Sequence, residues 1–431
     1  MKKITITFLS IIVFGCTPKE DLLIIQQKEN FSVVEFSMKD PGSDAYEIQI
    51  TNETGFKKVL SNCKRDSTYS VIGLLSNSTY DFSVSSEERD FTQSFTTDSL
   101  PSSSLYDFEM VVDDYRFPGK LLFHQSDSFG RNQVLLSGSD AQIYWYGTFL
   151  YESGPIHFTK DQTIFNLFGF KDLYEVDLFG NTLFQASLGE AGFTEELHHD
   201  IKSEDGIIYS MAKVVHRNLG KNIQSISGTD TLGCDAIHVF DREMNKIWEW
   251  TMFDSVNPFD KNFTPRILND WGHANSLFKD VDGHYLISFR NLNQIWKVHS
   301  ETGALLYIFG ENGDIQPLAE DQFKAQHYAH INKNGELMIF DNMGAGGQTR
   351  AISFEIDETN KKATKKLEVL LPKEMFSAKR GSVQIIDDNK LLFCSTLSNN
   401  IVVTDMEGTI LWNMKIPRNT YRVEYVTGLY F

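Results

Sequence analysis

The feature that most constrains the fold is a hairpin pattern that recurs along the C-terminal three quarters of the chain. Most copies are an apolar strand, a polar turn containing Gly or Asn, and a second strand with an aromatic residue. The copies lie at 140–146, 173–184, 239–248, 295–307, 351–357 and 402–412. Six units over roughly 310 residues approach the spacing of propeller blades, and a two-sheet sandwich would not repeat a whole hairpin six times. We therefore predict an all-β chain in which residues 105–431 form a six-bladed β-propeller, with a last strand at 421–425 that completes the first blade.

Residues 31–98 carry a different pattern. Apolar and polar residues alternate at 46–50 and at 80–84, which predicts half-buried strands of a small β-sandwich. The stretch 74–84, followed by Phe95-Thr96-Thr97, resembles a fibronectin type III domain. Such a domain would act as a spacer or packing module. The Ser-rich segment 99–104 is the expected linker to the propeller.

The N-terminus has the character of an export signal. Lys2 and Lys3 precede an apolar run at 4–14, which is too short to span a bilayer of roughly 30 Å. The run ends in Val13-Phe14-Gly15-Cys16, which resembles a lipobox. We expect residues 1–15 to be a lipoprotein signal peptide, Cys16 to be lipidated and 16–30 to be a tether. The expected location is the outer membrane of a cell envelope, on its periplasmic face or at the cell surface.

The charge balance restricts the partners. The chain has 58 acidic and 40 basic residues, a net charge of −18, and no basic stripe, which argues against nucleic acid. A site for an anionic substrate must therefore gather its own positive charge. Cys63, Cys234 and Cys394 are scattered and no CxxC occurs, so buried free thiols are expected, although one bridge involving Cys234 stays open.

Three blades begin with a His-containing segment. These segments are HHDI at 198–201, WGHANSL at 271–277 and QHYAHI at 326–331, and each runs into a turn and an apolar strand. His199, His273 and His327 thus occupy the same place in blades three, four and five. Because the first strand of each blade lines the central channel, the three imidazoles should converge at one mouth of it. The neighbours His198 and His330 are alternative members of the same set.

Arg290 closes the strand that follows His273, in the sequence Leu286-Ile287-Ser288-Phe289-Arg290. The partner of an axial strand can return a side chain to the same mouth. A guanidinium has a fixed charge and forked donors that suit a tetrahedral oxyanion. The sequence therefore predicts an anion site formed by Arg290 and the imidazoles.

Taken together, HHD, WxHxNS followed by SxR, and QH followed by NGxLxxFDN resemble the bacterial arylsulfotransferase family. That family transfers sulfuryl groups between phenols without a nucleotide sulfate donor. The resemblance covers roughly 105–431 and includes the ending Asn419-Thr420-Tyr421-Arg422. It implies that His327 is the nucleophile of a ping-pong reaction through a sulfohistidine, and that His199 assists by proton transfer or hydrogen bonding.

The resemblance also implies the residues that bind the substrate. His273 and Asn275, with Arg290, would hold the sulfuryl oxygens. Asp341 and Asn342 of the FDN motif would complete the substrate site by orienting the loop around His327. The implied substrates are small aryl sulfates and phenols. Two departures from the family pattern are visible, namely Tyr328 after the QH motif and a short stretch between Arg290 and His327. The shortened stretch would alter the acceptor pocket or abolish turnover.

Two other functions stay open at this point. Three converging imidazoles could bind a divalent metal, as in a metal-dependent propeller lyase. The chain could instead be a non-catalytic binding propeller at the cell surface. The arylsulfotransferase interpretation requires no cofactor and no catalytic metal, although a structural Ca²⁺ is compatible with the channel. The N-terminal domain could also mediate a homodimer.

Overall fold

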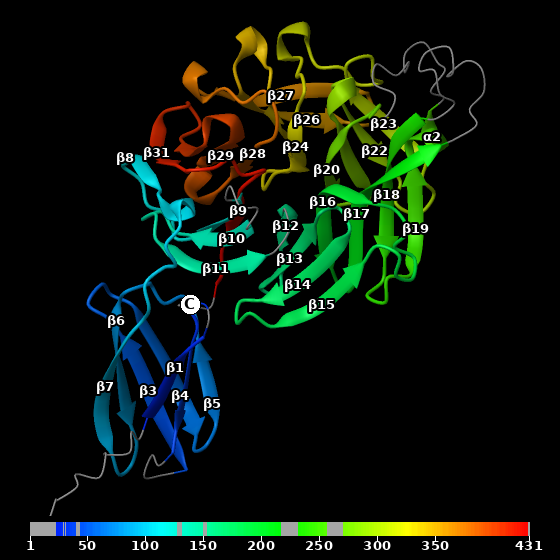
Figure 1. Ribbon diagram of the computed structural model, residues 1–431. Helices are drawn as coiled ribbons and strands as arrows, with labels where there is room; N and C mark the ends of the chain where they lie inside the picture. The colour runs from blue at the N-terminus through cyan, green and yellow to red at the C-terminus, as the bar shows by residue number, and fades with distance from the viewer. Residues whose placement is uncertain are drawn as a thin grey trace, which may run out of the picture.

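The computed structural model describes residues 23–28, 30, 32–39, 44–126, 132–149, 153–216, 232–256 and 270–429. The predicted signal peptide and Cys16 lie outside the described residues. Within them the chain is all-β, as predicted, and Figure 1 shows a small blue sandwich below a larger ring of sheets. No helix in this part of the chain is long and apolar enough to cross a membrane.

The N-terminal part is a two-sheet sandwich. Its core draws residues from both sheets, including Phe36, Ile48 and Phe82, because alternate residues of each strand point inward. Tyr80 anchors one corner, since its hydroxyl accepts a hydrogen bond from the Leu75 N–H at 2.7 Å, as in immunoglobulin-like sandwiches. The assignment to the fibronectin type III class stays a prediction. One sheet is β1 (Leu23–Gln27), β2 (Val34–Met38) and β5 (Thr68–Val71), and the other is β4 (Lys57–Lys64), β3 (Ala45–Thr51), β6 (Thr79–Ser85) and β7 (Asp90–Thr96).

The expected tether at 16–30 needs a correction. Residues Leu23–Gln27 form β1, which pairs antiparallel with β2. Leu23 is fully buried in the sandwich core, so this short apolar segment gains more by completing the sheet than by staying in solvent. The sandwich therefore begins before residue 31.

The described strands of the propeller form six sheets, one for each predicted blade. Consecutive inner strands contact one another around the channel. The first three blades are β9 (Lys120–Ser126), β10 (Asn132–Ser137) and β11 (Ile143–Phe149); β12 (Ser153–Phe158), β13 (Thr163–Phe168), β14 (Asp172–Asp177) and β15 (Thr182–Ser187); and β16 (Leu197–Glu204), β17 (Ile207–His216), β18 (Leu232–Phe240) and β19 (Lys246–Thr251), followed by the short helix α2 (Met252–Ser255). The last three are β20 (Ala274–Lys279), β21 (Tyr285–Phe289), β22 (Gln294–Val298) and β23 (Leu305–Gly310); β24 (His327–Ile331), β25 (Leu337–Asp341), β26 (Arg350–Asp357) and β27 (Lys362–Leu370); and β28 (Ser382–Ile385), β29 (Leu391–Ser395), β30 (Asn400–Thr404) and β31 (Ile410–Lys415).

Both ends of the propeller sequence close the ring. At the C-terminal end, β32 (Glu424–Val426) pairs with β9 and becomes the inner strand of blade one, as predicted. At the N-terminal end, β8 (Glu109–Asp113) adds to β31 as a fifth, outer strand of blade six. The two additions join the first and last blades through backbone hydrogen bonds.

The aromatic residue of the repeated hairpin joins adjacent blades. Trp145 on β11 donates through its indole Nε1 to the Leu178 carbonyl of blade two at 2.8 Å, and Trp412 on β31 donates likewise to Ser139 of blade one. Both indoles are almost completely buried. The pattern seen in the sequence thus reflects a large apolar side chain whose N–H reaches the next blade.

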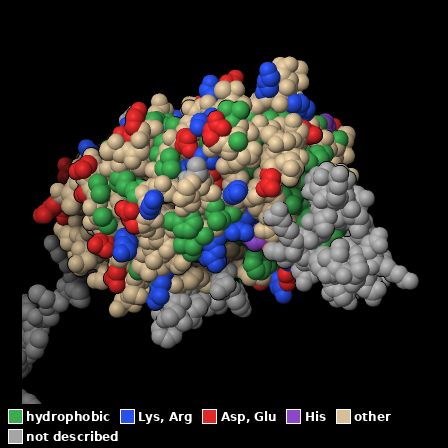
Figure 2. Space-filling model, turned by 90° about the horizontal axis from the view of Figure 1, so that it is seen from above, with side chains coloured by type: hydrophobic (Ala, Val, Ile, Leu, Met, Phe, Trp, Pro, Cys, Tyr) green, Lys and Arg blue, Asp and Glu red, His purple; other side chains and the backbone are tan. Residues whose placement is uncertain are grey.

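The sandwich contacts blade one of the propeller. Val33 and Ile72 from the sandwich share a buried cluster with Leu122 and Trp145. Cys63, Cys234 and Cys394 are buried free thiols, as expected. Figure 2 shows acidic and basic side chains interspersed over the face seen from above, without a continuous basic stripe in the coloured part.

Candidate active site

A cavity of about 600 Å³ lies where the inner strands of the propeller begin. Every blade contributes to its lining, because inner strands of successive blades start at the same end of the channel. Blade one contributes Arg418, Asn419 and Tyr421 ahead of β32, with His124 and Ser126 on β9, and blade two contributes Gly154 and Pro155 in β12 with Phe170 after β13. Blades three to six contribute His199 in β16, His273 ahead of β20 with Arg290 after β21, His327 at the start of β24, and Lys379 and Arg380 ahead of β28. The structure therefore brings His199, His273, His327 and Arg290 to one cavity.

The imidazoles lie close to one another around Tyr421. The ring centroids of His199 and His273 are 5.0 Å apart, and those of His327 and Tyr421 are 6.5 Å apart. A left-handed residue interrupts the backbone in each His segment, at His199 (φ 56°), His273 (φ 52°) and Tyr328 (φ 53°). Non-glycine residues adopt this conformation at a cost that the surrounding fold must offset, and such strain is concentrated at functional sites.

His327 is held as one tautomer. Its Nδ1 faces two acceptors, the Asn342 Oδ1 at 2.7 Å and the Ala325 carbonyl at 3.1 Å. The Asn342 amide cannot be turned round, because its Nδ2 donates to the carbonyls of Ser377 and Arg380. The proton of His327 is therefore on Nδ1. The lone pair is on Nε2, which accepts from the Arg380 backbone N–H at 3.1 Å.

Burial keeps the imidazoles of His327 and His199 neutral. It lowers the pKa of His327 to about 3, with Arg290 and His273 adding repulsion. Burial also holds the pKa of His199 well below its usual range, with further lowering by His198 and His273. A neutral imidazole is nucleophilic at Nε2 without prior loss of a proton.

His273 has a different partner from the other two imidazoles. Its Nδ1 contacts the Asp270 carboxylate, which fixes the proton on that nitrogen and orients the ring. His199 instead shares a hydrogen bond of 2.8 Å between its Nδ1 and that of His198. Both residues of the His198-His199 pair thus contribute, with His199 at the cavity and His198 behind it.

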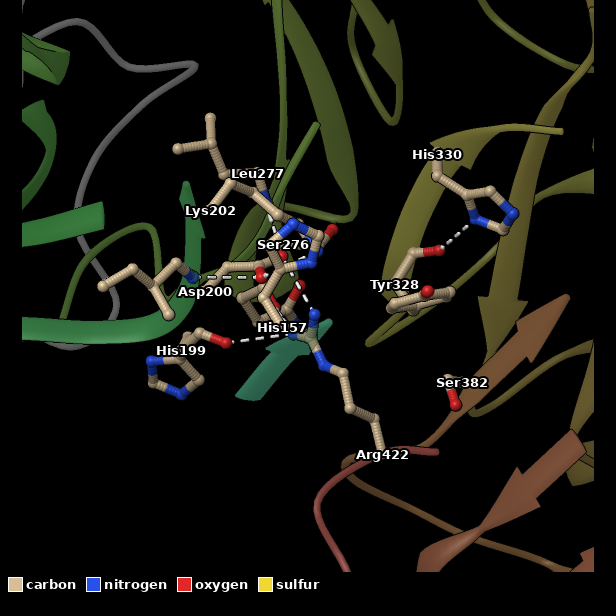
Figure 3. A network of polar contacts seen from close by, with 12 residues as sticks. His157, His199, Asp200, Lys202, Ser276, Leu277, Tyr328, His330, Ser382 and Arg422 are labelled. Carbon is tan, nitrogen blue, oxygen red and sulfur yellow. Dashed lines mark hydrogen bonds and ion pairs between the residues drawn. The ribbon is translucent and has the colours of Figure 1, made fainter. Parts of the chain in front are cut away.

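The buried Arg422 holds the floor of the site together. Its guanidinium donates to the carbonyls of His199 at 3.0 Å and Asn275 at 3.2 Å, and forms an ion pair of 3.0 Å with Asp200 (Figure 3). Asp200 in turn accepts from the Leu277 N–H of the next blade. One side chain of the closing segment therefore positions the His segments of blades three and four.

Asn275 and Asp341 lie away from the cavity. Asn275 is fully buried, and its amide donates to the Gln326 carbonyl beside His327 at 2.7 Å. Asp341 is buried in an ion pair of 2.9 Å with Arg350 and accepts from the Lys324 N–H. This geometry therefore does not give Asn275 the direct contact with substrate that we expected. Asn275, Asp341 and Asn342 all act on the segments that carry His327.

Several site residues were missed in the sequence. Lys379, Arg380 and Arg418 line the cavity, and so does His124, whose pKa burial and the nearby Arg380 lower to about 4. The signal was positional. Lys379 and Arg380 precede the inner strand of blade six, and Arg418 precedes that of blade one, as the His segments precede those of blades three to five.

Tyr328, noted as a departure, lies with its ring 5.0 Å from the Arg422 guanidinium and outside the cavity lining.

The donor set does not fit a three-His metal site. Among the described residues, three metal-type ligand atoms come within 4.8 Å of one another only at Asp280, Asp282 and Glu358. There the Lys297 ammonium already contacts all three carboxylates, at 2.8, 2.5 and 2.5 Å. In the cavity, His327 Nδ1 is hydrogen-bonded and its Nε2 faces an N–H donor, which a cation would not tolerate.

Comparison with solved structures finds several proteins that match this chain at low identity. They include a protein of unknown function from Bacteroides caccae (12% identity, 72% of this chain and 100% of that one, TM-score 0.45). They also include virginiamycin B lyase from Staphylococcus aureus (10%, 71% and 87%, 0.40) and BamB from Moraxella catarrhalis (8%, 75% and 91%, 0.35). No curated protein matches the chain.

Comparison with family models gives a specific result. The model of the arylsulfotransferase (ASST) family matches residues 113–424, which include the inner strands of blades two to six and every residue that lines the cavity. The match covers well over half of the 431 residues. The chain therefore belongs to the arylsulfotransferase family.

Proposed function

We propose that this protein transfers a sulfuryl group from an aryl sulfate donor to a phenolic acceptor through a sulfohistidine at His327. The observation that carries the proposal is the fixed tautomer of His327, which presents an unprotonated Nε2 in a cavity beside Arg290. Family membership supports sulfuryl transfer as the reaction class.

The first half-reaction forms the covalent intermediate. The Nε2 lone pair of His327 forms an N–S bond while the bond between sulfur and the aryl oxygen breaks, and the phenolate leaves. The proton on Nδ1 stays in its hydrogen bond to the Asn342 amide oxygen, whose dipole stabilises the positive charge that develops on the ring. Attack requires Nε2 to release the Arg380 N–H, which is then free to donate to a sulfuryl oxygen.

The second half-reaction regenerates the enzyme. The acceptor phenol gives its proton to His199, and its oxygen forms an O–S bond as the N–S bond of sulfo-His327 breaks. The depressed pKa keeps His199 unprotonated before the acceptor binds, so its lone pair is available for that proton. The same low pKa makes protonated His199 pass the proton on to solvent, which restores the free enzyme. Sulfuryl transfer resembles phosphoryl transfer in needing alignment and charge stabilisation more than strong covalent assistance. Arg290 and His273 would supply that stabilisation for the sulfuryl oxygens.

The test is transfer from 4-nitrophenyl sulfate to phenol, followed through released nitrophenol. His327→Ala should abolish transfer, whereas His284→Ala, a change of the same residue type in the turn between β20 and β21 and outside the cavity lining, should leave it intact. Normal turnover by His327→Ala would refute the nucleophile assignment. If the unaltered protein releases no nitrophenol across several aryl sulfates, a non-catalytic binding propeller becomes the better account.

We also propose that Cys16 is lipidated and anchors the protein to the outer membrane. The proposal rests on the lipobox-like sequence ahead of Cys16. Partition of the expressed protein into detergent should depend on Cys16, so Cys16→Ser should remove the lipid mass from the N-terminal peptide. An unmodified N-terminus in the unaltered protein would contradict the anchor.

A further inference from the structure

The lining of the cavity is cationic although the chain is acidic. It contains Arg290, Lys379, Arg380 and Arg418 and no acidic side chain, whereas acids outnumber bases 58 to 40 in the sequence. In the described part of the chain, none of the four side chains forms an ion pair with a carboxylate. Arg290 contacts only the Asn291 side-chain oxygen and the Ala378 carbonyl, at 3.3 and 3.4 Å. The cavity thus holds more positive charge than the protein itself neutralises.

The four cations serve two parts of the cavity. Arg290 belongs to the sulfuryl part, since its backbone N–H donates to the His273 carbonyl at 3.1 Å. The side chains of Lys379 and Arg380 come from the loop ahead of blade six, and Arg418 comes from the neighbouring blade one, which also carries His124. A sulfuryl group carries a single negative charge, which Arg290 and the neighbouring donors can match. The other three cations then have no counterpart in a simple aryl sulfate.

We propose that Lys379, Arg380 and Arg418 form a second anion subsite, and that the substrates are arenes bearing another anionic group besides the reacting oxygen. This inference rests on the proposed function and names its substrate class. The second group is a carboxylate, sulfonate or phosphate, because guanidinium and ammonium donors suit these anions. A cavity of about 600 Å³ is large enough for a ring with two anionic substituents.

The remaining lining suits the ring that joins the two anions. Phe170 lies at the cavity and is 48% exposed, so its ring is free to contact an arene. Lys379, Arg380 and Arg418 are exposed as well, so their attraction for an anion is screened by solvent. We therefore expect a second anionic group to tighten binding by about tenfold at low salt, with the gain falling as salt rises.

The experiment compares three unreactive sulfonates by calorimetry with the full chain. Benzenesulfonate probes the sulfuryl part, and 4-sulfobenzoate adds a carboxylate. In 4-carbamoylbenzenesulfonate an uncharged amide of similar size replaces that carboxylate. We expect 4-sulfobenzoate to bind about tenfold more tightly than the carbamoyl compound at low salt. Equal affinities for the two would overturn the second subsite, even if 4-nitrophenyl sulfate is turned over normally. Tight binding of 4-sulfobenzoate by a protein that does not turn over 4-nitrophenyl sulfate would support the subsite and refute the proposed reaction.

A charge-matched pair of variants locates the effect. Lys379→Gln with Arg418→Gln should abolish the preference for 4-sulfobenzoate; Arg380 is left intact because its N–H contacts His327. Lys57→Gln with Lys362→Gln removes the same charge from exposed positions on the sandwich and on outer strand β27, and should keep the preference. A preference that survives Lys379→Gln with Arg418→Gln would contradict the assignment. Acceptor phenols that carry a carboxylate, a sulfonate or a phosphate then show which of the three anionic groups the subsite prefers.

Discussion

Arg422→Gln should lower the free energy of unfolding of the propeller by about 3 kcal/mol. The guanidinium is 3% exposed, and its loss would leave the buried Asp200 carboxylate without its ion pair of 3.0 Å. Removing one partner of a buried pair costs about 3–5 kcal/mol. The lower end applies because Asp200 keeps the Leu277 N–H at 3.1 Å and Lys202 at 3.8 Å.

Tryptophan fluorescence in urea measures this change. All six Trp residues lie at position 145 or beyond, so the signal reports the propeller and not the sandwich. Asp200→Asn with Arg422→Gln should cost less stability than Arg422→Gln alone, because the double variant has no uncompensated charge. Transfer activity should stay low in both, since the carbonyls of His199 and Asn275 lose their donor in each. If Arg422→Gln unfolds within about 0.5 kcal/mol of the unaltered protein, Arg422 does not hold the site together.

Two further outcomes follow from the same contacts. Asn342→Ala frees the tautomer of His327 and should lower kcat by about 10²-fold with a smaller change in KM; a KM effect alone would contradict the orienting role. The free energy of unfolding should fall as pH drops from about 6.5 toward 4. Burial lowers the folded-state pKa of His198 and His330 to about 4, so in this range the unfolded state binds protons that the folded state does not. Each of the two groups lowers the free energy of unfolding by about 1.4 kcal/mol per pH unit. Asp235 opposes this trend, since burial raises its pKa to about 6 and the folded state then keeps a proton that the unfolded state releases. Urea unfolding at pH 7 and pH 5 measures the net change, and equal stability at both would refute it.

Much of the fold was predictable because it repeats. The hairpin at 402–412 is one copy of the repeated pattern. Trp412, which ends it, donates to a backbone carbonyl of the next blade, as Trp145 does. The positions of His199, His273 and His327 followed from the same repeat, since equivalent strand starts meet at one mouth. Local sequence therefore predicted both the sheets and one side of the site.

The remainder depends on contacts between residues far apart in sequence. Nothing around Arg422 indicates that it reaches Asp200, more than two hundred residues away, because β32 must first close the ring.

Lys379 and Arg418 lie in loops without periodic pattern, and only the position of those loops at the start of inner strands identifies them. Asn275 follows His273 by two residues in the motif, yet the bulge in β20 directs its amide to Gln326 and away from the cavity. An apolar run of four residues at 22–25 was too short to predict β1 without its partner strand.

The most direct test of the account is the mass of the peptide that contains His327 after rapid mixing with 4-nitrophenyl sulfate in the absence of acceptor. The account predicts that this peptide gains the mass of one sulfuryl group, that the label is acid-labile, and that added phenol removes it as phenyl sulfate forms. Turnover with no label on His327, or a label on another residue that phenol removes, would contradict it.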